Sequence, residues 1–116
     1  MSTTISGDSA GFENDYSPGS SCTGYSANGT DVVYSVTLAA GETLDASLLG
    51  SHDTSLYVVS DCTDVTASCL AGDDTFGSNP EVVTYTSMAG ETVFLIVDGY
   101  SGSGTYDLTV TLTPAP

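Results

Sequence analysis

The sequence predicts an all-β protein, an antiparallel β-sandwich of jelly-roll-like architecture with seven to eight short strands. Two observations indicate this fold. Apolar and polar residues alternate with a period of two through most of the chain, and no window shows the period of an α-helix. Glycine-rich turn segments separate the alternating runs at short intervals, which is typical of sandwiches.

Six runs carry the alternation, and the last of them is the most regular. In that run Tyr106, Leu108, Val110 and Leu112 take the inward positions, while the residues between them are polar. Residues 93–97 are apolar on both sides, as expected for a central strand that is covered on both faces. The expected strands cover residues 31–38, 42–49, 54–60, 81–87, 91–99 and 104–113.

The segment Ala-Gly-Glu-Thr occurs twice, at residues 40–43 and 89–92, and each copy lies between two of these runs. Such short connections need a residue with a positive φ, which glycine adopts without steric cost. We therefore expect Gly41 and Gly90 to have positive φ angles. Local turn chemistry explains the repeat better than an internal duplication.

The length of 116 residues predicts a single domain, residues 1–116. Residues 1–30 form an acidic N-terminal segment, residues 31–112 form the core, and residues 113–116 (Thr-Pro-Ala-Pro) resemble a linker. Residues 1–6 are strand-like and can pair with a sheet edge, either in the same chain or in a neighbouring one. The longest apolar run is too short to span a bilayer, and no signal-peptide pattern is present.

The chain contains 15 acidic residues and no lysine or arginine, so its formal net charge is −15. Nucleic acids and anionic lipids are bound by lysine and arginine, so we expect neither nucleic-acid binding nor membrane insertion. Metal cations, basic proteins and neutral partners such as glycans remain as binding partners.

Three cysteines are present. Cys62 and Cys69 lie seven positions apart in a polar, turn-rich segment, and this spacing predicts a disulfide that closes a short hairpin-like loop. The alternative is two reduced thiols in a cytosolic protein. Cys22 is then left over, and we interpret it as a buried thiol or as a link to a second chain.

The order of these segments resembles the bacterial pre-peptidase C-terminal domain family, which is related to the collagen-binding domains of clostridial collagenases. The resemblance rests on "GTDVVYSVTLAAGETL", "HDTSLYVVSDC", "CLAGDD" and "GETVFLIVDGYSGSGTYDLTV", and covers about residues 29–112. Members of this family are non-catalytic β-sandwiches of secreted and cell-surface bacterial proteins. The resemblance therefore implies an extracellular accessory or scaffolding role.

The N-terminal segment carries a candidate calcium site. Calcium prefers carboxylate and amide oxygens, and Glu13, Asn14 and Asp15 are consecutive in the sequence. In the related collagen-binding domains, calcium lies between such an acidic segment and an aspartate that begins a strand. Asp31 occupies the matching place, and Asp8 can add a ligand. The alternative is a solvated acidic loop.

A second and weaker calcium candidate lies in "GDDTFGSNPE", with Asp73, Asp74, Asn79 and Glu81. The family often carries paired aspartates here, so these residues can instead form turns that satisfy backbone donors. Asp98 is also interpreted as a turn residue.

Catalysis is not expected. His52 is the only histidine, and the Asp53 beside it is interpreted as a turn residue that bonds the backbone. Tyr25, Phe76 and Tyr100 fall in expected loops and are candidates for ligand contact.

These patterns favour a non-enzymatic, secreted, calcium-stabilised building block that associates with copies of itself, in a homo-oligomer or a filament. The alternative is an accessory domain that binds a ligand such as a collagen-like protein or a glycan.

Overall fold

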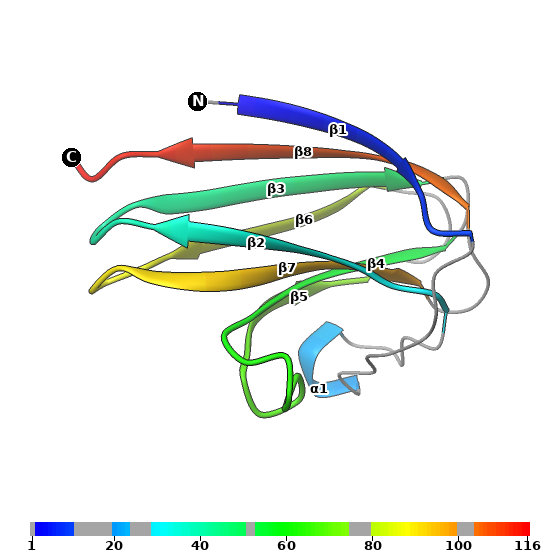
Figure 1. The fold of residues 1–116 in the computed structure, drawn as a ribbon, viewed down its shortest axis with the longest axis horizontal. Coiled ribbons are helices and arrows are strands. Elements are labelled where there is room, and N and C mark those ends of the chain that lie inside the picture. Colours follow the sequence, from blue (N-terminus) through cyan, green and yellow to red (C-terminus); the bar gives the residue numbers. More distant parts are fainter. Residues whose placement is uncertain (1, 11–19, 24–28, 51–52, 75–79, 100–103) are drawn as a thin grey trace.

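The computed structural model describes residues 2–10, 20–23, 29–50, 53–74, 80–99 and 104–116. It is a β-sandwich of two four-stranded sheets in which every strand pair is antiparallel (Figure 1). This confirms the fold class predicted from the alternation. The elements are β1 (Ser2–Asp8), α1 (Ser20–Thr23), β2 (Val32–Leu38), β3 (Thr43–Gly50), β4 (Thr54–Val59), β5 (Cys69–Asp73), β6 (Glu81–Thr86), β7 (Glu91–Gly99) and β8 (Thr105–Thr113).

The first sheet has the strand order β1-β8-β3-β6, and the second has the order β2-β7-β4-β5. β1 lies on the edge of the first sheet, beside β8 (Figure 1). β7 is a central strand between β2 and β4, and its residues Val93, Leu95, Ile96 and Val97 are buried, as their apolar run predicted.

The main core lies between the sheets. Leu44 and Leu48 of β3 face Leu56 and Val58 of β4 in one cluster of fully buried side chains. A second, smaller cluster lies on the opposite face of β4, because Tyr57 and Val59 alternate with those residues along the strand. α1 lies over β5 on that side (Figure 1).

The two Ala-Gly-Glu-Thr turns have the predicted backbone. Gly41 has a φ of 81° and Gly90 a φ of 83°. The turns are neighbours, since Gly41 N donates to Ser87 O (2.6 Å) and Ser87 N donates to Glu42 O (3.0 Å). Both connections therefore close the same end of the sandwich, and the site described below lies at the other end.

The predicted disulfide between Cys62 and Cys69 is wrong. Cys22 is bonded to Cys69, with 5.8 Å between their Cα atoms, so Cys22 is not a link to a second chain in this structure. The reason is the packing of α1 on β5, which brings Cys22 next to the first residue of that strand. No helix among the described residues is long and apolar enough to cross a membrane.

Candidate metal centre

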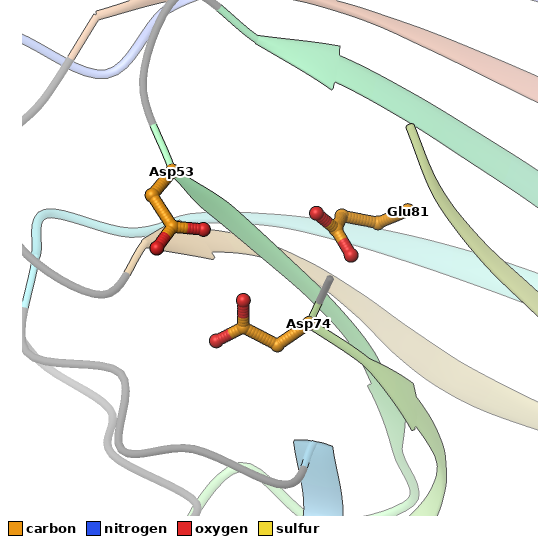
Figure 2. A group of neighbouring side chains, drawn as sticks. All are labelled: Asp53, Asp74 and Glu81. Atoms are coloured by element: carbon orange, nitrogen blue, oxygen red, sulfur yellow. The ribbon is translucent and has the colours of Figure 1, made fainter. Parts of the chain in front are cut away.

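Three carboxylates from three different strand ends meet at one end of the sandwich. Asp53 directly precedes β4, Asp74 directly follows β5, and Glu81 is the first residue of β6. One carboxylate oxygen from each lies within 4.8 Å of the others. Figure 2 shows the three side chains turned towards a common space. We call this group the acidic centre.

Strand pairing explains why these residues meet. β4 and β5 are antiparallel, with Leu56 opposite Asp73, so the beginning of one strand lies beside the end of the other. β6 belongs to the other sheet, and its buried positions alternate from Glu81 to Val83. The side chain of Glu81 therefore points between the sheets, towards Asp53 and Asp74.

Two members of the acidic centre are removed from water. Glu81 is 0% exposed and Asp74 is 6% exposed, while Asp53 is half-buried. Two buried oxygen atoms, Oδ1 of Asp53 and Oγ1 of the adjacent Thr54, have no hydrogen-bond partner in the described part of the chain. Buried oxygens of this kind are costly unless a donor or a cation compensates them.

Burial raises the pKa of Asp74 to about 6. The hydroxyl of Ser55 donates a hydrogen bond to Asp74 Oδ2 (2.8 Å) and opposes this change, while the negative charges of Asp53 and Asp73 add to it. Near neutral pH a carboxyl with this pKa prefers its charged form only weakly, so a cation in the acidic centre would compete with protons for Asp74.

Asp98 and Asp31 lie beside the acidic centre. Both are buried, and burial raises the pKa of Asp98 to about 8, with further contributions from the charges of Asp31 and Asp74. Asp98 Oδ2 accepts a hydrogen bond from the hydroxyl of Tyr57 (2.6 Å), and its Oδ1 accepts one from Gly99 N (2.8 Å). The sequence had indicated a turn residue at Asp98. The structure instead places Asp98 at the buried end of β7.

The structure divides the second calcium set predicted from the sequence. Asp74 and Glu81 are brought together, whereas Asp73 accepts a hydrogen bond from Val82 N (2.8 Å) and ties β5 to β6. Asn79 lies outside the described residues. Asp53 was missed as a ligand, because it lies beside Asp74 only through the pairing of β4 with β5, a strand that the alternation did not reveal.

The first calcium set stays a prediction. Glu13, Asn14 and Asp15 lie outside the described residues, as do the candidate contact residues Tyr25, Phe76 and Tyr100 and the single histidine, His52. Asp31 is 4% exposed and lies at the same end as the acidic centre. Asp8 is exposed, and its Oδ1 accepts a hydrogen bond from Ala10 N (2.9 Å).

A shallow groove of about 520 Å³ lies where the ends of β1, β3 and β8 meet. Asp8, Asp107 and Leu49 contribute to its lining, and Leu49 is 50% exposed. The groove therefore combines two acidic groups with an exposed apolar side chain.

No protein-family model matches the sequence, and no curated protein matches it. Solved structures are similar in fold. One is a periplasmic inhibitor of g-type lysozyme from Aeromonas hydrophila, with a TM-score of 0.63, 13% identity, and coverage of 97% of this chain and 86% of that chain. Another is the pre-peptidase C-terminal domain of a collagenase from Bacillus anthracis, with a TM-score of 0.63, 19% identity, and coverage of 96% and 90%. The chain therefore has the fold of pre-peptidase C-terminal domains, as its sequence had indicated.

Proposed function

We propose that the chain is a non-enzymatic, extracellular β-sandwich module that binds calcium at the acidic centre and associates with copies of itself. One structure of similar fold is a lysozyme inhibitor and another is a domain of a collagenase, which supports a module without its own catalysis. The disulfide between Cys22 and Cys69 supports an oxidising compartment outside the cytosol.

One observation carries the calcium proposal: two buried carboxylates and the half-buried Asp53 converge in a chain that has no lysine or arginine. Two negative charges no more than 4.8 Å apart repel by at least roughly 3 kcal/mol at an effective dielectric constant of about 20. Protons or a metal ion must therefore offset this repulsion. Near neutral pH a divalent cation does so without requiring the carboxyls to be neutral.

The donor set fits calcium. All three groups offer carboxylate oxygens, and hard cations such as calcium take six to eight oxygen ligands, including backbone carbonyls and water. Asp53, Asp74 and Glu81 would hold the ion, and the ion would supply positive charge that ties β4 and β5 of one sheet to β6 of the other. Its role would be structural.

Thermal unfolding with calcium and with a chelator tests this proposal. Ligand that binds only the folded state stabilises it by about 2.7 kcal/mol at a hundredfold excess over Kd, so calcium should raise the Tm of the wild type. Glu81→Gln keeps the shape of the side chain and should abolish most of this increase. Asp107→Asn removes an exposed charge elsewhere and should keep it.

The proposal fails if calcium leaves the Tm of the wild type unchanged, or if Glu81→Gln keeps the full increase. An increase that persists in Glu81→Gln and disappears in Asp31→Asn would place the ion at the N-terminal set and not at the acidic centre.

The edges of the first sheet support self-association. β1 and β6 are its two edge strands, and residues 2–7 contain no charge and no proline, the features that usually protect an edge. The sheet has four antiparallel strands. Because neighbouring strands alternate in direction and their number is even, β1 and β6 run in opposite directions. When a second copy is placed beside the first in the same orientation, its β1 is therefore antiparallel to β6 of the first copy. Head-to-tail addition can therefore repeat without limit and produce a filament.

Electron microscopy and light scattering of calcium-loaded protein test this contact. Thr4→Asp on β1 and Val82→Asp on β6 place a charge at one edge each, and each alone should abolish head-to-tail assembly. Leu49→Asp, on the central strand β3, is the matched control and should still assemble. Assembly that survives Val82→Asp but not Thr4→Asp would indicate closed β1–β1 dimers and contradict a filament.

Binding of a basic protein is the second candidate function. The groove between Asp8 and Asp107, with the exposed Leu49, suits a cationic side chain with an apolar stem, and one structure of similar fold is an inhibitor of lysozyme. A strictly monomeric chain that binds a basic protein, and loses this binding in Asp107→Asn, would favour this function over assembly.

A further inference from the structure

All three cysteines pack against one small cluster. The cluster consists of Tyr57, Val59, Val65 and Ile96, which are buried on the face of the second sheet that points away from the main core. Cys22, Cys62 and Cys69 are partly buried against it. Cys22 and Cys69 form the disulfide, and Cys62 is a half-buried thiol. A disulfide and a thiol therefore share one packing site.

The loop between β4 and β5 brings Cys62 towards Cys69. Asp61 and Ser68 each directly precede one of these cysteines, and the two residues are hydrogen-bonded to each other: Asp61 N donates to Ser68 Oγ (3.1 Å), and Ser68 Oγ donates to Asp61 O (2.8 Å). Ser60 N also donates to Ser68 O (3.1 Å). The backbone is thus already closed at the point where a bond between Cys62 and Cys69 would form.

We propose that Cys62 is the nucleophile of an internal thiol–disulfide exchange. The thiol of Cys62 loses its proton to solvent, and its thiolate Sγ attacks Sγ of Cys69. The bond between Cys62 and Cys69 forms as the bond between Cys22 and Cys69 breaks, and Cys22 leaves as a thiolate that takes up a proton. One disulfide and one thiol are present before and after, so no oxidant or reductant is needed.

The exchange changes what the disulfide holds. In the structure the bond fastens α1 to β5, and the carbonyl oxygen of Cys22 lies so close to Gly72 that a Cβ atom there would collide with it. After exchange the bond closes only the loop that follows β4. α1 then keeps its non-covalent contacts alone, and Cys22 becomes the reactive thiol. This inference is independent of calcium and of self-association.

Mass spectrometry of the wild type tests the exchange. Protein that starts with the Cys22–Cys69 bond is kept without oxygen at about pH 8, and samples are quenched with acid at intervals. Each sample is labelled with N-ethylmaleimide at acid pH and then digested at aspartates. Cleavage at Asp64 separates Cys62 from Cys69 in the sequence, so that a cross-link between them can be recognised. We expect the label to appear on Cys22 in step with a Cys62–Cys69 cross-link, at a rate that is independent of protein concentration and increases with pH.

A label confined to Cys62 at all times would overturn the proposal, and so would labelling of Cys22 at a rate proportional to protein concentration. Cys62→Ser is the control and should never be labelled at Cys22, because the attacking group is gone. Labelling there would mean that another reductant opens the bond, and the proposal would be wrong.

Cys22→Ser provides a second test that does not depend on the rate. Under mild oxidation we expect this variant to form the Cys62–Cys69 disulfide and to keep the circular dichroism spectrum of a β-sandwich. If both cysteines stay reduced under conditions that fully oxidise the wild type, Cys62 does not reach Cys69 and the proposal fails.

Discussion

Asp98 shows how a single buried carboxyl is accommodated in a chain without basic side chains. It is 1% exposed and accepts hydrogen bonds from the hydroxyl of Tyr57 and from Gly99 N. Burial nevertheless raises its pKa to about 8, because the charged form loses its hydration and also feels the charges of Asp31 and Asp74. Below about pH 8, the protonated form of Asp98 is therefore favoured in the folded state.

The stability of the calcium-free protein should fall as the pH rises. An unfolded aspartate titrates near pH ~3.9, so folded Asp98 keeps its proton between about pH 4 and pH 8, where the unfolded chain releases it. The folded state binds more protons in this window, and the free energy of unfolding decreases with pH. The raised pKa of Asp74 acts in the same direction up to about pH 6.

Urea unfolding at several pH values, in the presence of chelator, checks this expectation. Asp98→Asn removes the titrating group and should flatten the decrease between about pH 6 and pH 8, while Asp107→Asn, which removes an exposed charge, should not. A wild type whose stability increases across this window would contradict the assignment.

Several residue-level features could be predicted from the sequence because their causes are local. Positive φ angles at Gly41 and Gly90 follow from the short Ala-Gly-Glu-Thr turns. The role of Asp98 could not be predicted, because its environment comes from Tyr57 on the neighbouring strand β4 and from a charge near another strand end.

At the scale of elements, β3 separates two environments along one strand. Leu48 is 0% exposed and packs in the main core, whereas Leu49, the next residue, is 50% exposed on the outer face. Leu48→Ala should lower the free energy of unfolding by about 2–5 kcal/mol, through lost transfer energy and the cavity left behind. Leu49→Ala should change it by less than about 0.5 kcal/mol. Denaturant unfolding that gives equal losses for both variants would contradict this arrangement of β3.

The strands that follow Asp31 were predicted where alternation is strong, and two elements were missed. β5 is short, contains Gly72, and is only partly buried along its length, so it lacks a clear period of two. α1 has four residues, which is too few to show a helical period. The cysteine pairing was predicted wrongly because both partners lie in these two missed elements. The contact of α1 with β5 joins segments that are far apart in the sequence.

At the scale of the whole molecule, the acidic centre exists only because two sheets pack face to face. Asp53 and Asp74 come from the second sheet, and Glu81 comes from the first. The sequence left metal cations among the partners of a chain of charge −15, and its second calcium candidate, with Asp73, Asp74, Asn79 and Glu81, already contained two of the three residues. It could not indicate Asp53, because the distance between strand ends of different sheets depends on the register and packing of the complete sandwich.

The most direct test of calcium binding at the acidic centre is a crystal structure of the protein grown with calcium, with an anomalous difference map to locate the ion. We expect a peak between Asp53, Asp74 and Glu81, with an oxygen of each about 2.3–2.6 Å from the ion. An acidic centre without an anomalous peak at saturating calcium, or a peak located only at residues 13–15, would contradict the proposal.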